Sequence, residues 1–76
     1  MTMACMLVRT ERGKFEQVTK NLRQIPEVKR VFPVLGRFDV VVDIEAANTR
    51  QLARAVLKAN RLVGVVYTET LPEVEG

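Results

Sequence analysis

The stretch that decides the fold is Val34-Leu35-Gly36-Arg37-Phe38-Asp39-Val40-Val41-Val42-Asp43-Ile44-Glu45-Ala46. From Phe38 onward, apolar side chains fill every second position, which is the period of a β-strand with one buried face. Val41 adds an apolar residue to the other face, so we expect this strand inside a sheet and not at its edge. Gly36 can adopt the positive φ of a tight connection, which predicts a hairpin with the segment before it.

The segment before Gly36 is predicted to be the hairpin's first strand, over residues 28–35, and it carries apolar side chains on both parities. Pro33 lies within it and has no backbone N–H to donate to a neighbouring strand. We therefore expect this strand at the edge of the sheet, or bulged at the proline.

A strand and a helix are predicted before the hairpin. Residues 3–9 form an almost continuous apolar run, which is typical of a strand covered on both faces. Phe15, Val18 and Leu22 then recur at helical spacing and indicate an amphipathic helix. Pro26 ends this helix, because proline removes a backbone donor and restricts the residue before it.

A second helix and a last strand are predicted after the hairpin. Asn48 to Gln51 resemble a capping box, in which the Asn48 side chain accepts from the Gln51 N–H and the Gln51 side chain reaches back. The buried stripe of this helix is Leu52, Ala55, Val56 and Ala59. Gly64 marks a turn or bulge, residues 63–71 alternate as a strand, and residues 72–76 are expected to be a flexible acidic tail.

The predicted order is β-α-β-β-α-β, the ferredoxin-like arrangement of the α+β class, in a single domain over residues 1–76. Two right-handed crossovers place both helices on one face of a four-stranded antiparallel sheet. Because each strand carries apolar residues on both parities, the helix-free face is also expected to be apolar. We predict that it packs against a second copy, sheet to sheet, which also adds the burial that a chain of 76 residues cannot supply alone.

Composition excludes several classes of site. Cys5 is the only cysteine and the chain has no histidine, so neither a disulfide nor a metal site is expected. We expect Cys5 to be a buried thiol in a cytoplasmic protein. The first residues do not resemble a signal peptide, and no apolar run approaches the about 20 residues that span a bilayer. The net charge of +3 is too small by itself to indicate nucleic-acid binding.

The chain shows no pattern typical of an enzyme. It lacks serine as well as histidine, and it has no glycine-rich phosphate loop, so we expect neither catalysis nor a cofactor.

Three fragments together resemble a known family. They are Pro26-Glu27-Val28, the stretch Val34 to Val41, and Gly64-Val65-Val66-Tyr67-Thr68-Glu69-Thr70. In this order, from about residue 3 to residue 74, they are similar to the ligand-binding RAM domain of the Lrp/AsnC transcriptional regulators. Met1 leads directly into the first strand, so the chain resembles the stand-alone members without a helix-turn-helix.

The resemblance implies an amino-acid-binding and oligomerisation module linked to the transcriptional regulation of amino-acid metabolism. It implies dimers joined through their sheets, rings such as octamers or decamers, and a free amino acid bound between dimers. It also implies association with full-length Lrp/AsnC regulators, with no direct binding to DNA and none to membranes. The family's effector position carries over to Gly36, Arg37, Phe38, Asp39, Thr68 and Thr70.

These residues suit an α-amino acid, because a carboxylate such as Asp39 can pair with its ammonium group. Its carboxylate can be received by backbone N–H groups near Gly36, by Arg37 or by a threonine hydroxyl. The same residues are also ordinary for a turn and a strand.

Two other functions remain open. An ACT-like regulatory or interaction subunit shares the fold class, and some small ferredoxin-like dimers are oxygenases or isomerases. A closed pocket within one monomer, holding a carboxylate with a raised pKa, would favour an enzyme, whereas a pocket between subunits would favour binding.

The second predicted helix carries a basic stripe with no acid between its members: Arg50, Arg54, Lys58 and Arg61. Such a stripe is most often a solvated face. The alternative is a docking surface for nucleic acid or an acidic protein, because phosphate contacts need little more than aligned cations.

Overall fold

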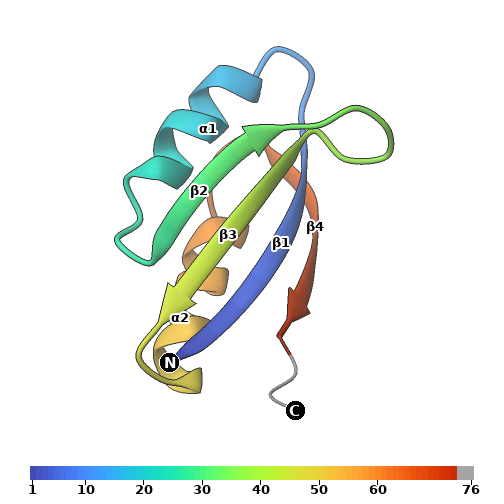
Figure 1. Ribbon diagram of the computed structural model, residues 1–76. Helices are drawn as coiled ribbons and strands as arrows, with labels where there is room; N and C mark the ends of the chain where they lie inside the picture. Colours follow the sequence, from blue (N-terminus) through green and yellow to red (C-terminus); the bar gives the residue numbers. More distant parts are fainter. Residues whose placement is uncertain (74–76) are drawn as a thin grey trace.

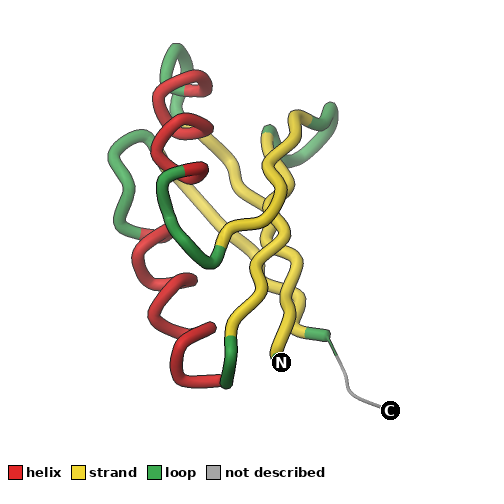
Figure 2. The backbone as a smooth tube through the Cα atoms, turned by 60° about the vertical axis from the view of Figure 1, so that its left-hand side comes forward, coloured by secondary structure: helices red, strands yellow, loops and turns green. Residues whose placement is uncertain are grey.

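The computed structural model, which describes residues 1–73, contains the six predicted elements in the predicted order (Figure 1). They are β1 (Thr2–Thr10), α1 (Phe15–Arg23), β2 (Val28–Pro33), β3 (Val40–Ala46), α2 (Thr49–Asn60) and β4 (Val65–Pro72). All strand pairs are antiparallel and the order across the sheet is β2-β3-β1-β4. Figure 2 shows both helices on one face of the sheet. The predicted ferredoxin-like fold is confirmed.

The core lies between the sheet and the helices, and strand parity decides which residues enter it. Val40, Val42 and Ile44 of β3 are buried, as the alternation in the sequence predicts. Phe38, in contrast, precedes β3 and lies in the connection between β2 and β3. The largest side chains that the other elements bury completely are Met6, Val8, Val18 and Leu22.

The proline in β2 is accommodated as expected at an edge. Strand β2 pairs only with β3, and Pro33 is its last residue. The irregularity in this pairing lies between Val28 and Arg30 and not at the proline. At the other edge, β4 includes Pro72, and the Glu73 N–H donates to the Met3 carbonyl at 2.9 Å. Order thus extends into the predicted tail, of which residues 74–76 lie outside the described residues.

The face of the sheet away from the helices is uncovered, and it carries apolar side chains together with charged ones such as Arg30 and Asp43. Residues directly opposite one another in antiparallel strands point to the same face, so Val41, Leu7 and Glu69 form one row across it. Six apolar side chains lie on this face, which we call the open sheet face: Met3, Leu7, Phe32, Val41, Tyr67 and Leu71. The helix-free face therefore carries apolar residues, as predicted, with charged residues among them.

Cys5 corrects one expectation, because it is only partly buried. Ala4, Met6 and Val8 occupy the helix-covered side of β1, so the odd-numbered residues between them point to the open sheet face. Cys5 lies there, opposite Asp43 of β3. An apolar run with both parities filled does not reveal which parity faces the helices, so the sequence pattern did not distinguish these positions.

Candidate functional site

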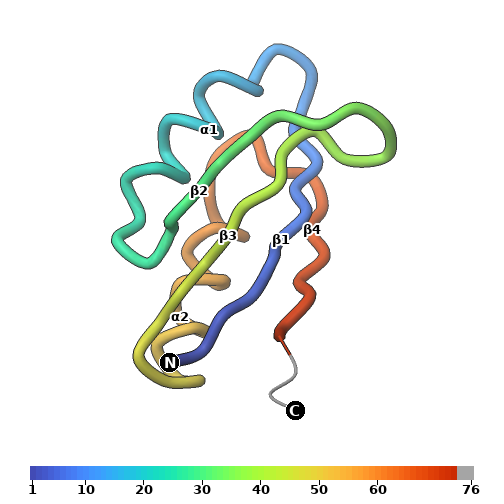
Figure 3. The backbone as a smooth tube through the Cα atoms, viewed as in Figure 1, coloured from blue at the N-terminus to red at the C-terminus, as the bar shows by residue number. Residues whose placement is uncertain are grey.

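The connection between β2 and β3, residues 34–39, is the first candidate for a site because it carries four of the predicted ligand-binding residues. Figure 3 shows it as a loop that extends beyond the sheet. Gly36 has a φ of +125°, the positive value that the sequence predicts. Gly36 and Arg37 are both exposed. The Val34 N–H donates to the Asp39 carbonyl at 3.0 Å and closes the base of the loop.

Asp39 anchors this loop to the central strand β1. Its Oδ2 accepts hydrogen bonds from the Thr10 N–H at 2.8 Å and from the Thr10 hydroxyl at 3.3 Å. Its own N–H donates to the Val8 carbonyl at 2.9 Å. Asp39 therefore has a structural role at the end of β1, beyond the local turn of the loop, and Oδ1 takes no part in the bonds with Thr10.

Phe38 lies beside Tyr67 of β4. Their ring centroids are 6.0 Å apart and their planes differ by 21°, which is a stacked arrangement. Such pairs contribute about 0.5–1.5 kcal/mol beyond the burial of their area. Tyr67 is opposite Arg9 in the sheet, so this aromatic pair lies at the loop end of the open sheet face.

Thr68 and Thr70, the two remaining predicted residues, lie on the other side of β4. They are opposite Val8 and Met6, which point into the core beneath the helices. The Thr68 hydroxyl donates to Oδ1 of Asn60, at the end of α2. Thr68 also lines a cavity of about 280 Å³ together with Asn60, Val65, Val66 and Tyr67.

Within one chain, the six predicted ligand-binding residues therefore lie in two separate places. Phe38 of the loop stacks with Tyr67 at the open sheet face, whereas the threonines face the helical side of an edge strand. Sequence reasoning missed Thr10, Tyr67 and Asn60 as their direct partners. The strand register would have brought Thr10 near Asp39, because β1 runs antiparallel to β3.

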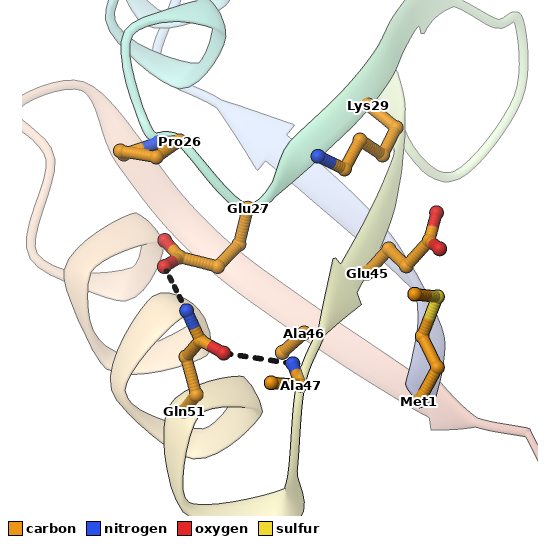
Figure 4. Close-up of a pocket in the computed structure, with 8 residues that line it drawn as sticks. All are labelled: Met1, Pro26, Glu27, Lys29, Glu45, Ala46, Ala47 and Gln51. Carbon is orange, nitrogen blue, oxygen red and sulfur yellow. Dashed lines mark hydrogen bonds between the residues drawn. The ribbon is translucent and has the colours of Figure 1, made fainter.

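A second candidate lies at the opposite end of the sheet, where β2 begins and β3 ends (Figure 4). It is a depression of about 290 Å³ lined by Met1, Pro26, Glu27, Lys29, Glu45, Ala46, Ala47 and Gln51. Gln51 fixes one side, because its Nε2 donates to the Glu27 carboxylate at 3.0 Å and its Oε1 accepts from the Ala47 N–H at 2.7 Å. Lys29 and Glu45 lie on the other side.

The cap of α2 explains why Gln51 is held there. The Asn48 side chain accepts from the Gln51 N–H at 2.8 Å, as the sequence predicts. The Gln51 side chain, however, reaches the N–H of Ala47, one residue before the expected cap position. Its amide nitrogen is thereby directed at Glu27.

The depression combines charges of both signs and could receive the two charged groups of a zwitterion. Lys29 is exposed, and Glu27 and Glu45 are partly exposed, so all three can meet a ligand from solvent. In the sequence Glu27 is only part of a family fragment, because its contact with Gln51 spans 24 positions and arises only in the folded chain.

The electrostatics of the open sheet face centre on Asp43. Its carboxylate accepts from the Arg30 Nε at 2.9 Å, and the Arg30 guanidinium lies 5.2 Å from the centre of the Phe32 ring. Partial burial, and secondarily the charge of Asp43, raise the pKa of the Cys5 thiol above its ordinary value of 9.0.

Neither a metal centre nor a membrane span is found in the part of the chain that the structure describes. Residues 1–73 contain no group of three or more histidine, cysteine, aspartate or glutamate side chains placed to hold a metal ion. No helix among them is long and apolar enough to cross a membrane.

Comparison with known proteins identifies relatives among transcriptional regulators. The HTH-type transcriptional regulator FL11 of Pyrococcus horikoshii is 32% identical over 69 residues, which cover 91% of this chain and 46% of that protein. The chain thus spans about half the length of the curated relatives that it matches.

Solved structures share the fold. FFRP-DM1 superposes with a TM-score of 0.92 at 28% identity, over 97% of this chain and 100% of that chain. The transcriptional regulator NMB0573 of Neisseria meningitidis, solved in complex with L-Met, has a TM-score of 0.81 at 18% identity, over 97% of this chain and 50% of that one. This second likeness shows the fold alone.

The family assignment agrees with the fold and covers nearly the whole sequence. The model of the Lrp/AsnC ligand binding domain matches residues 3–74. The chain belongs to the Lrp/AsnC ligand-binding domain family.

Proposed function

We propose that this chain is a cytoplasmic, non-catalytic module that binds a free amino acid and changes its assembly state in response, and so takes part in transcriptional regulation. The observation that carries the proposal is the family match over residues 3–74. The regulators related to this chain support the regulatory role. The complex of the Neisseria regulator with L-Met supports an amino acid as the class of ligand.

The first step of assembly in this proposal is a dimer joined through the open sheet face. Met3, Tyr67 and Leu71 are 44%, 56% and 50% exposed there, although they are large apolar side chains. A contiguous apolar surface of this kind is typical of an interface. A second copy of the same face supplies a matching apolar surface. Such dimers would then assemble into rings, such as octamers or decamers.

Effector binding would then use the loop between β2 and β3 from one chain and β4 from another. Within one chain, Phe38 of the loop stacks with Tyr67 at the open sheet face, whereas Thr68 and Thr70 lie on the helix-covered side of β4. A site that contains both groups therefore needs a second chain. In it, Asp39 would receive the ligand's ammonium group, while the N–H groups near Gly36, the Arg37 guanidinium and the threonine hydroxyls would receive its carboxylate.

The test is the solution mass and the melting temperature of the protein, measured with each of the twenty amino acids in turn. We expect a dimer or larger ring whose size or melting temperature responds to one or a few of them, because a ligand that binds one state better shifts the equilibrium toward it. An assembly whose mass and melting temperature respond to none of the twenty would contradict effector binding, and a stable monomer would contradict the dimer.

Two variants then distinguish the two candidate locations of the effector. Asp39→Asn removes a charge at the loop, and Lys29→Ala removes one at the depression beside Gln51. We expect weaker binding from Asp39→Asn and unchanged binding from Lys29→Ala. The reverse result would show that the effector binds in the depression beside Gln51 and not at the loop.

The proposed partner in regulation is a full-length Lrp/AsnC regulator that mixes with this chain in one assembly. Co-purification of the two proteins, each carrying a different tag, measures mixing directly. We expect the bound amino acid to change the mixed fraction, because only a ligand with different affinities for the two assemblies can shift their balance. A mixed fraction that stays the same with and without the amino acid would contradict this route.

A further inference from the structure

The charged residues of the chain are divided unequally between the helical layer and the sheet. The two helices with their flanking residues, 11–24 and 48–61, contain eight of the 12 lysine and arginine residues and two of the nine acids. Both helices lie on the same face of the sheet (Figure 2). The face opposite the open sheet face is therefore strongly basic, although the net charge of the whole chain is only +3.

Helix α2 carries the most ordered part of this charge. Arg50, Arg54, Lys58 and Arg61 are all exposed, and the spacing of the first three by four residues places a cation about every 6 Å along one side of the helix. Residues 48–61 contain no acid. None of these four side chains forms an ion pair with any described residue, and the ion pair that the structure does show joins Arg30 to Asp43.

The stability of the helix explains only the end of this stripe, where Lys58 in the last turn suits the helix dipole. Like charges four residues apart destabilise a helix, as with Arg50 and Arg54 and again with Arg54 and Lys58. Arg50 also lies in the first turn of α2, which contains no acidic residue, although the helix dipole there favours a negative charge. An external anion would relieve both effects at once.

Contrary to the expectation from the family resemblance that the chain does not bind DNA directly, we propose that the exposed side of α2 binds the phosphate backbone of nucleic acid, independently of base sequence. The stripe presents long, unpaired cations along a line, which is what contact with consecutive phosphates requires. This binding differs from the reading of base edges by a helix-turn-helix. Because α2 lies on the face away from the open sheet face, it stays accessible when two sheets pack together.

An acidic protein fits the same charges less well. Protein interfaces are enriched in arginine, which this stripe has, but also in aromatic anchors at their centre. The apolar side chain exposed within this stripe is Leu57, at 51%, and α2 contains no aromatic residue. The surface is therefore cationic without the anchor that a protein partner normally uses.

The test measures binding of the full chain to a short, fluorescently labelled DNA duplex of arbitrary sequence, over a range of salt concentrations. Four phosphate contacts predict a slope of about −3.6 in a plot of log affinity against log salt, equivalent to roughly a 100-fold loss between about 50 and 200 mM. The triple variant Arg50→Gln, Arg54→Gln, Lys58→Gln is expected to reduce the slope to about −0.9 and to weaken binding at low salt at least tenfold.

A second triple variant is the matched control. Arg12→Gln, Lys20→Gln, Arg23→Gln also removes two arginines and one lysine, all exposed, and gives the same net charge. We expect it to stay within about threefold of the parent in affinity, because its charges lie outside the α2 stripe. The melting temperatures of both variants verify that they fold.

Three results would overturn the proposal. The parent chain could fail to bind DNA at low salt, or both triple variants could lose affinity equally, which would indicate attraction by net charge alone. Alternatively, poly-glutamate could displace DNA at equal concentration of charge, which would indicate an acidic protein as the partner. Retained binding by the control together with loss in the α2 variant supports the proposal.

Discussion

Asp39 and Thr10 are separated by 29 positions in the sequence, and the carboxylate of Asp39 accepts hydrogen bonds from both the backbone N–H and the hydroxyl of Thr10. The loop between β2 and β3 is thereby joined to the end of β1. Asp39 is also the residue to which we assign the ammonium group of the effector. One side chain would thus stabilise the fold and bind the ligand, so a single substitution must be chosen to separate the two roles.

Asp39→Ala should lower the free energy of unfolding by about 1–3 kcal/mol, because it leaves the Thr10 N–H without its acceptor in a partly buried place. Asp39→Asn keeps an acceptor oxygen and should cost less than about 1 kcal/mol. Urea denaturation of both variants measures these values. Equal losses in the two variants would show that charge, and not hydrogen bonding, is what Asp39 supplies.

The same pair of variants tests effector binding by calorimetry with the amino acid that the screen identifies. Asp39→Asn should weaken binding while leaving the dimer intact, since it removes the negative charge but retains the bond to Thr10. Loss of the dimer with unchanged affinity would contradict the role that we assign to Asp39.

Gly64 connects α2 to β4 at a position where no other residue fits. Its φ is +96°, and a Cβ built there would lie 2.8 Å from the Lys14 Cβ and 2.9 Å from the Val18 Cγ2. Gly64→Ala should therefore destabilise the protein by about 2 kcal/mol or more, from backbone strain and steric overlap together. Thermal or urea unfolding measures the loss.

Gly13→Ala is the control for this substitution. Gly13 also has a positive φ, of +82°, but nothing lies within 4 Å of its Cβ position. It should lose only about 1 kcal/mol, from the backbone term alone. If the two variants were equally destabilised, the close approach of α1 to Gly64 would contribute nothing to the loss of stability in Gly64→Ala.

The sequence predicted those features that follow from local periodicity and local chemistry. Val40, Val42 and Ile44 share the wholly apolar parity of β3, whereas Asp43 and Glu45 lie on the other, so their burial could be inferred from β3 alone. Pro33 lacks a donor, which predicts either an edge position or a bulge for β2, and the edge position is the one observed. Each of these inferences needs only residues that are near in sequence.

The features that escaped prediction depend on register and packing between elements. Cys5 lies in a run where both parities are apolar, so only the pairing with Asp43 reveals its face. The contacts of Asp39 with Thr10 and of Gln51 with Glu27 span 29 and 24 positions. A local pattern does not specify which of several polar residues will meet across such distances, and both candidate sites depend on a contact of this kind.

The thiol of Cys5 should make stability depend on pH in the alkaline range. Its pKa is raised by partial burial and by the charge of Asp43, so the folded chain holds the proton more tightly than the unfolded chain does. This contribution is fully present below the ordinary pKa of 9.0 and is lost as the pH rises through the higher pKa of the folded state. The difference in unfolding free energy between the parent and Cys5→Ala should therefore change above pH 9.0 and stay constant below it.

Asp43→Asn separates the two causes of this shift. It should lower the pKa of Cys5, measured by the ultraviolet absorbance of the thiolate, but leave it above 9.0, because burial is the larger cause. A pKa that fell to 9.0 in this variant would assign the whole shift to the charge of Asp43.

The open sheet face offers the most direct test of the dimer. Val41 lies between Leu7 of β1 and Phe32 of β2, so Val41→Lys places a charge among apolar neighbours at the centre of this face. Within one chain the lysine can extend into solvent, and the fold should survive. In the proposed dimer it would be buried without a partner, at a cost of several kcal/mol, which raises the dimer dissociation constant at least about 100-fold.

Sedimentation or light scattering across a dilution series measures that constant, with circular dichroism to verify folding. Val63→Lys is the control, since Val63 is 73% exposed in the connection between α2 and β4, outside the open sheet face, and this variant should dimerise like the parent. A Val41→Lys protein that folds and still dimerises normally would show that the two copies meet elsewhere. The ring in which the loop between β2 and β3 of one chain meets β4 of another would then have to be built from a different dimer.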